Sequence, residues 1–94
     1  MDSFRDRIAV VTGGGTGMGK AISTLLGAAG VNVAVNYSRS EAEAIETAEE
    51  LTKAGVEAMP IRADVSSSAD VAAMIEQTER QLGRVDILVN NAGY

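Results

Sequence analysis

The chain has 94 residues, 46% of them hydrophobic, and a net charge of −5, which is enough for one small domain. It has no cluster of Lys and Arg, which argues against nucleic acid as a partner. It contains neither cysteine nor histidine, which excludes disulfides, thiolate chemistry and the usual zinc sites. No apolar run reaches a membrane span and the N-terminus lacks a signal peptide's apolar region, so we expect a cytoplasmic protein without a membrane partner.

The predicted elements alternate between strand and helix along the whole chain. Short β-branched apolar runs predict buried strands, and apolar residues at helical spacing predict amphipathic helices. In chain order they are a strand over 7–12, a helix over 17–29, a strand over 31–35, a helix over 41–54, a strand over 56–61, a helix over 71–82 and a strand over 85–89.

Local signals mark several boundaries of these elements. Ser40 with Glu43 matches a capping box, and Ser67 with Asp70 offers a second helix N-cap. Pro60 makes the third strand resemble an edge strand, because proline cannot donate to a strand ladder. Each predicted helix ends before a glycine, which is a typical helix stop; these are Gly30, Gly55 and Gly83.

Strands and helices that alternate with short loops predict an α/β fold with a parallel sheet and right-handed helical crossovers. The strands are continuously apolar rather than alternating, which fits a sheet covered on both faces. We find no linker, repeat or low-complexity segment. The sequence therefore predicts one domain over residues 1–94.

The stretch 12–19 (Thr-Gly-Gly-Gly-Thr-Gly-Met-Gly) joins the first strand to the first helix. Its five glycines carry a large entropic cost, so we expect close backbone approach to a ligand and helix N–H groups aimed at an anion. An ordinary tight turn needs fewer glycines. A triphosphate loop, from Gly14 to Lys20, would need a Ser or Thr hydroxyl where Ala21 stands. The strict G-x-G-x-x-G pattern is also not met.

Four separated motifs together resemble the short-chain dehydrogenase/reductase family. They are Thr12-Gly13-x-x-x-Gly17-x-Gly19, Asp64-Val65, Asp86-Ile87-Leu88-Val89 and Asn90-Asn91-Ala92-Gly93. The segment 33–38 is most similar to the 3-oxoacyl-[acyl-carrier-protein] reductase and glucose dehydrogenase branches. The resemblance implies a Rossmann-type doubly wound parallel sheet of four strands, in order 3-2-1-4, with three helices. It also implies that the chain is the N-terminal dinucleotide-binding part of such a protein, truncated after strand four.

The resemblance also assigns cofactor-binding residues. Asp64 and Val65 would form the adenine pocket, and Gly19 would let the first helix pack against strand one. Asn90 would steady the sheet. The pyrophosphate would be wrapped by Gly13, Gly15, Thr16, Gly17 and Met18, and the ribose would lie against Asn91, Ala92 and Gly93.

The end of the second strand decides the choice of cofactor. An NAD site has Asp or Glu there to bond the ribose 2′-OH, but this chain has Tyr37, followed by Ser38 and Arg39. No carboxylate in this stretch would repel a 2′-phosphate, and Ser38 and Arg39 can both bond one. The sequence thus favours NADP(H) over NAD(H), although Thr16 stands where many NADP-preferring relatives have a basic residue.

The family's catalytic Ser and Tyr-x-x-x-Lys lie downstream of residue 93, so we predict no catalytic residue and no metal ligand here. Tyr37 has Glu41 at the offset where Lys is needed. The resemblance implies an oxidoreductase that transfers hydride between NADP(H) and a small carbonyl or alcohol substrate, with the 94-residue chain inactive alone. The alternative is a non-catalytic nucleotide-binding module. The family is usually homo-oligomeric, and an exposed strand over 85–89 would favour self-association of this chain.

Overall fold

The computed structural model describes residues 4–91, and the structural statements below concern that range. It confirms the predicted alternation. The elements are β1 (Ile8–Val11), α1 (Gly17–Ala28), β2 (Asn32–Tyr37), α2 (Glu41–Lys53), β3 (Ala58–Arg62), α3 (Ser68–Gln81) and β4 (Ile87–Val89). Helices α1, α2 and α3 are followed by the predicted glycine stops.

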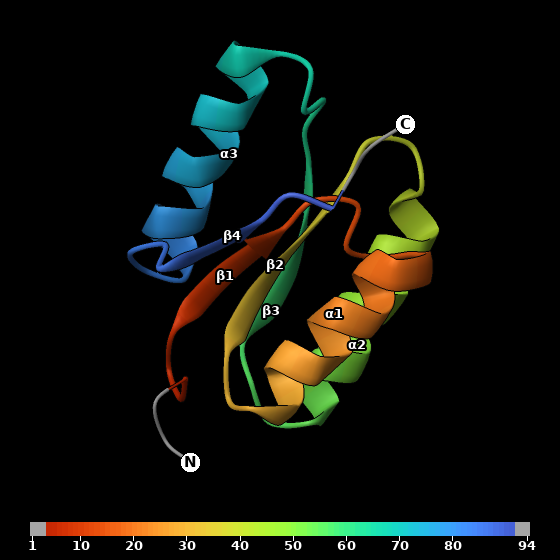
Figure 1. Cartoon of the computed structure of the whole chain (residues 1–94), viewed down its shortest axis with the longest axis vertical. Coiled ribbons are helices and arrows are strands. Elements are labelled where there is room, and N and C mark those ends of the chain that lie inside the picture. The colour runs from red at the N-terminus through yellow and green to blue at the C-terminus, as the bar shows by residue number, and fades with distance from the viewer. Residues whose placement is uncertain (1–3, 92–94) are drawn as a thin grey trace.

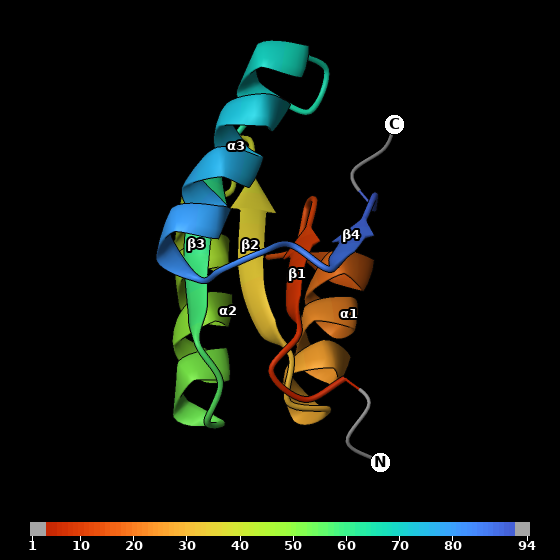
Figure 2. The same cartoon turned by 90° about the vertical axis from the view of Figure 1, so that its left-hand side faces the viewer.

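The strands form one parallel sheet in the order β3-β2-β1-β4, as predicted (Figures 1 and 2). In register, Val10 of β1 lies beside Ala34 of β2 and Leu88 of β4. Because all the strands are parallel, their carboxyl ends meet at one edge of the sheet. The loops that follow β1, β2 and β3 leave from that edge, so the predicted site segments start close together.

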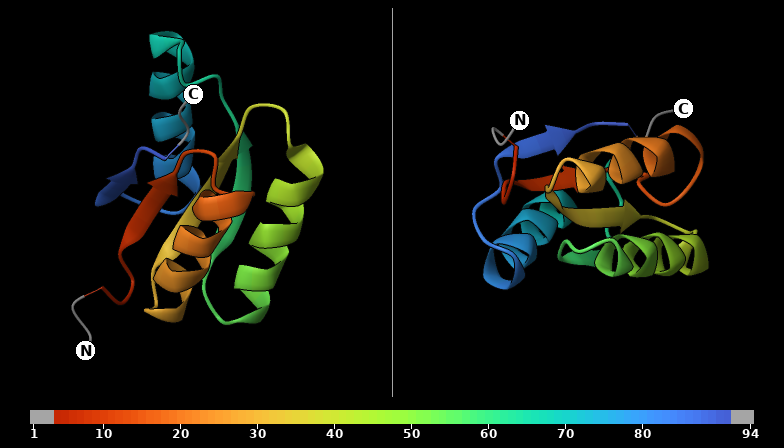
Figure 3. Two further views of the ribbon diagram at one scale, coloured as in Figure 1. Left: turned by 45° about the vertical axis from the view of Figure 1, so that its right-hand side comes forward. Right: turned by 90° about the horizontal axis from the view of Figure 1, so that it is seen from below.

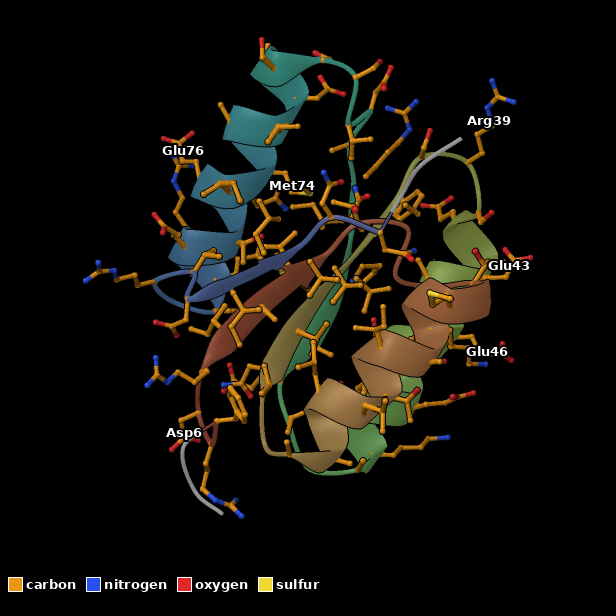
Figure 4. The ribbon with its side chains drawn as sticks, in the orientation of Figure 1. Asp6, Arg39, Glu43, Glu46, Met74 and Glu76 are labelled. Atoms are coloured by element: carbon orange, nitrogen blue, oxygen red, sulfur yellow. The ribbon has the colours of Figure 1, made fainter. Side chains whose placement is uncertain are left out.

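Helices α1 and α2 lie side by side over one face of the sheet, and α3 covers the other (Figures 1 and 3). Successive residues of β1 pack alternately on the two faces of the sheet. Ala9 and Val11 pack in the cluster under α1 and α2, whereas Val10 packs with Met74 of α3, which points toward the sheet (Figure 4). All four residues of β1 are buried, which explains why the strand is continuously apolar.

The two predicted N-caps have different outcomes. Ser67 caps α3, because the Asp70 N–H donates to its Oγ at 3.2 Å, and the helix begins at Ser68, three residues earlier than predicted. The prediction of a capping box at Ser40 is wrong. That residue makes no side-chain cap hydrogen bond and has φ −87° and ψ 61°, outside the extended conformation that aims an N-cap oxygen at the first turn.

Both outer strands of the sheet are edges. Strand β3 contains Pro60 and pairs only with β2 among the described strands, so the edge prediction is confirmed. Strand β4 is shorter than predicted, and Leu88 is 55% exposed on it. None of the helices within residues 4–91 combines the length and the apolar character that crossing a membrane requires.

Candidate functional site

The glycine loop leaves β1 and runs into the first turn of α1. Gly13 and Gly17 have φ values of 60° and 53°, in the region that favours glycine over any residue with a Cβ. The helix begins at Gly17, as predicted. A Cβ on Gly19 would overlap the carbonyl oxygen of Gly13. Gly19 therefore brings α1 against the loop itself, which corrects the expectation that it packs against the strand.

Each of the three consecutive glycine carbonyls at 13–15 accepts a side-chain hydrogen bond from a different part of the fold. Two of the donors, Ser23 and Thr47, are buried on α1 and α2. Asn91 Nδ2 donates to Gly13 O at 3.4 Å, Ser23 Oγ to Gly14 O at 3.1 Å and Thr47 Oγ1 to Gly15 O at 3.3 Å. The loop carbonyls thus point into the protein.

Asn36, the buried fifth residue of β2, holds the loop from the other side. Its Oδ1 accepts from the Gly13 N–H at 3.2 Å, and its backbone carbonyl accepts from the Gly14 N–H at 2.9 Å. Its Nδ2 donates to the carbonyls of Ile61 and Ala63, at 3.2 and 3.3 Å. One amide side chain therefore links the loop after β1 to the end of β3.

The end of β4 is tied to the same loop through Thr12. The Thr12 Oγ1 donates to the Val89 carbonyl at 3.2 Å and accepts from the Asn91 N–H at 2.8 Å. Val89 and Asn91 thus join this end of the sheet to Thr12 and the glycine loop. The predicted sheet-steadying role was given to Asn90, the residue between them.

The first turn of α1 presents backbone N–H groups beside this loop. These groups have no intrahelical acceptor, because a helix leaves its first N–H groups unpaired. The N-cap residue Thr16 makes no side-chain cap hydrogen bond, and the first turn has no acidic residue. A Cβ built on Gly17 meets no atom within 4 Å. The helix end is therefore open on one side, with a partial positive charge suited to an anion.

A cavity of about 240 Å³ joins the glycine loop to the end of β2. Gly13, Gly15 and Thr16 form one wall, and Tyr37 and the residues that follow it form another. Gly15 also lies against the start of α2, where an added Cβ would come within 2.7 Å of the Ala44 Cα. The full lining is Gly13, Gly15, Thr16, Asn36, Tyr37, Ser38, Arg39 and Ser40. The two segments that the sequence assigned to pyrophosphate and to cofactor choice therefore share one pocket.

Asp64 follows β3 at the same edge of the sheet and is part of a local turn. Its Oδ1 accepts from the hydroxyl of Ser66 at 2.6 Å and from the Ser66 N–H at 2.9 Å. These two hydrogen bonds hold the pKa of the Asp64 carboxyl below its usual range. The carboxylate is therefore charged near neutral pH, and its second oxygen is available as an acceptor. Val65, next to it, is 37% exposed.

The structure also bears on the triphosphate-loop alternative. Such a loop needs a lysine that reaches the phosphates, but Lys20 Nζ lies 3.7 Å from Glu50 Oε1 of α2, and Lys20 does not line the cavity. Within residues 4–91 there is also no group of three or more acidic residues that could hold a metal ion. The lysine of the triphosphate-loop pattern therefore lies against α2.

The family model for short chain dehydrogenase matches residues 7–94. This chain belongs to the short-chain dehydrogenase/reductase family. Among curated proteins, it is 58% identical to the short-chain dehydrogenase/reductase homolog YusS of Bacillus subtilis, over 93% of this chain and 80% of that protein. It is 44% identical to versicolorin reductase 1 of Dothistroma septosporum, over 99% of this chain and 36% of that protein.

Solved short-chain dehydrogenase/reductase structures share the fold closely. One is a dehydrogenase from Burkholderia cenocepacia with bound NADP, at TM-score 0.89 and 29% identity, covering 96% of this chain and 35% of that one. Another is the angucycline C-6 ketoreductase LanV with bound NADP, at TM-score 0.85 and 37% identity, covering 97% of this chain and 38% of that one. The chain thus spans well under half the length of these structures and of versicolorin reductase 1.

Of the residues assigned by resemblance to this family, those that the structure describes lie at four places. Gly13, Gly15, Thr16, Ser38 and Arg39 line the cavity. Gly17 and Met18 open α1 beside it, and Asp64 and Val65 follow β3 at the same sheet edge. Asn91 bonds the loop, whereas Ala92 and Gly93 lie outside the described residues.

The residues that hold the loop in place are not predicted from the sequence. Asn36, Ser23 and Thr47 are all at most 1% exposed, but each reads as an ordinary polar residue in a strand or helix. For Asn36 a signal exists, because a polar amide is unusual at the end of an otherwise apolar, fully buried strand. Ser23 and Thr47 offer no such signal, since both types are common on helix surfaces.

Proposed function

We propose that this chain binds a nicotinamide dinucleotide, with NADP(H) favoured over NAD(H), as the cofactor-binding part of a short-chain reductase. The observation that carries the proposal is the single cavity shared by the glycine loop and residues 36–40. In that arrangement one anionic group would meet the open end of α1, while a second would lie next to Ser38 and Arg39. A dinucleotide with a 2′-phosphate has both groups.

The residues present fit this cofactor. The pyrophosphate would be held by the backbone N–H groups of residues 15–18, because the N–H groups of Gly13 and Gly14 already donate to Asn36. Gly13 would lie against the pyrophosphate without donating to it. Ser38 and Arg39 would hold the 2′-phosphate by hydroxyl and guanidinium donors. Asp64 would accept from the adenine amine through its second oxygen, with Val65 against the ring.

We also propose hydride transfer between NADP(H) and a carbonyl or alcohol as the reaction of the whole protein. When bound, the nicotinamide ring supplies or accepts the hydride. The described residues bind and orient the cofactor. Two solved relatives with bound NADP and the name of versicolorin reductase 1 support this assignment. Ala92 and Gly93 remain assigned to the ribose on the family motif alone.

Calorimetric titration of NADPH and NADH into this chain tests the proposal, with Arg39→Ala as the variant. We expect NADPH to bind more tightly than NADH to the wild-type chain. The variant should lose affinity mainly for NADPH, because the Arg39 guanidinium that it lacks would pair with the extra phosphate. Equal loss for both cofactors would contradict the 2′-phosphate assignment. Tighter binding of ATP with Mg²⁺ than of either cofactor would revive the triphosphate loop.

A further inference from the structure

Tyr37 lies at the end of β2, at the position where an NAD-binding relative would carry a carboxylate. It lines the cavity, and its hydroxyl donates to Oε2 of Glu41 at 3.0 Å. Glu41 is the first residue of α2. The sequence segment 37–39 contains no acidic residue, but the fold brings one to the hydroxyl of a residue that lines the cavity.

The hydrogen bond holds the Glu41 carboxylate in a defined place. An exposed glutamate normally samples many rotamers, and a partner that fixes one of them concentrates its charge there. Partial burial, the hydrogen bond to Glu41 and its charge all raise the pKa of Tyr37. The phenol therefore remains protonated at neutral pH and continues to donate to the carboxylate.

Two cations lie near the same end of the sheet. Arg62 is the register partner of Tyr37 on β3, and its charge also acts on the phenol. Arg39 extends from the β2–α2 loop away from the sheet (Figure 4). Arg39 lines the cavity, and Glu41 reaches its wall through the lining residue Tyr37. A 2′-phosphate placed there would be attracted by Arg39 and repelled by Glu41.

We infer that Glu41, held by Tyr37, is a specificity-determining residue that lowers the preference of this site for NADP(H) over NAD(H). The inference rests on the proposed function, since it concerns the same cofactor. The carboxylate at the hydroxyl of Tyr37 takes part of the role of the acidic strand-end residue in NAD-binding relatives. Its removal should increase the selectivity for the 2′-phosphate.

The test compares Glu41→Gln with the wild-type chain and with Glu46→Gln as a matched control. Glu46 is on the same helix, further along, and points away from the sheet (Figure 4), so its removal changes the net charge equally. Dissociation constants are measured by calorimetry for NADPH and NADH. The same is done for adenosine 2′,5′-bisphosphate and AMP, a pair that isolates the 2′-phosphate.

We expect Glu41→Gln to raise the ratio of NADH to NADPH dissociation constants by roughly three- to tenfold, the size expected for one partly screened charge near the 2′-phosphate. Glu46→Gln should leave the ratio unchanged. Tyr37→Phe keeps the ring but releases the carboxylate, so it should move the ratio in the same direction by a smaller factor. The effect should shrink at about 0.5 M salt.

An unchanged ratio in Glu41→Gln, with both cofactors still bound, would overturn the inference while leaving the proposed function intact. Equal weakening of both cofactors would also overturn it, because it would indicate a structural role at the start of α2. If the wild-type chain binds none of the four ligands, the proposed function fails and the inference fails with it. Circular dichroism spectra of all variants identify any that are unfolded.

Discussion

Replacing Asn36 with alanine should destabilise the fold more than any other single polar truncation near the site. The side chain is 1% exposed, and its amide links three segments. Oδ1 accepts one N–H, and the two hydrogens of Nδ2 are shared among three carbonyls within 3.3 Å. Alanine would thus remove three hydrogen bonds and leave buried groups unpaired.

The expected cost is about 3 kcal/mol, taking about 1 kcal/mol for each lost hydrogen bond. A domain of this size has about 5–14 kcal/mol of total stability, so the variant should still fold. In urea, with a slope near 1.5 kcal/mol/M, the unfolding midpoint should fall by about 2 M. Far-UV circular dichroism measures both the midpoint and the slope.

Asn32→Ala is the matched control, on the same strand. Its Oδ1 accepts one exposed hydrogen bond, from the Glu57 N–H at 2.9 Å, so its loss should cost about 1 kcal/mol or less. If Asn36→Ala is no less stable than Asn32→Ala, the role assigned to the Asn36 amide is wrong. NADPH affinity should fall only in Asn36→Ala, because that variant no longer fixes the Gly13 N–H.

Three further predictions concern the loop, the turn after β3 and the sheet edge. The added methyl group in Gly19→Ala would overlap the Gly13 carbonyl and displace the loop. NADPH binding measured by fluorescence should therefore weaken at least tenfold. An unchanged affinity would contradict the close packing of Gly19 against the Gly13 carbonyl. Ser66→Ala removes the hydroxyl that donates to Asp64 but keeps the backbone N–H donor, so the Asp64 pKa followed by carbon NMR should rise toward its usual value. In the wild-type chain, the stabilisation from this depressed pKa is present above the unfolded-state pKa of Asp64 and is lost as the pH falls through its folded-state pKa. The variant should therefore lose less folding stability than the wild-type chain when the pH is lowered. Leu88→Lys places a charge on the exposed β4 edge. Sedimentation at high concentration should therefore show less self-association of the variant than of the wild-type chain. A wild-type chain that is already monomeric would contradict the prediction that this edge self-associates.

Much of the fold was predictable because its determinants are local. The apolar runs, the helical spacings and the glycine stops each act over a few residues, and all seven predicted elements are present. The failures were also local in origin. Ser40 has the residue type of an N-cap but the wrong backbone conformation, and the helix after Ser67 begins earlier than its apolar spacing indicated.

The sequence by itself determined the family, the parallel α/β architecture and the segments that form the candidate site. These follow from the order and spacing of motifs along the chain. Only the tertiary structure decided how the glycine loop is held, because its partners are distant in sequence. Asn36 and Thr47 lie 23 and 32 residues from their loop partners, and Asn91 lies 78 residues away.

The position of the Glu41 carboxylate near the cavity was also decided only by the tertiary structure. The sequence shows a strand end without a carboxylate, yet the fold turns the chain so that Glu41 meets the hydroxyl of Tyr37. A spacing of four residues across a loop does not fix such a contact, because it depends on how β2 leads into α2. Selectivity for a phosphate depends on through-space distances between charges, and tertiary packing alone sets those distances.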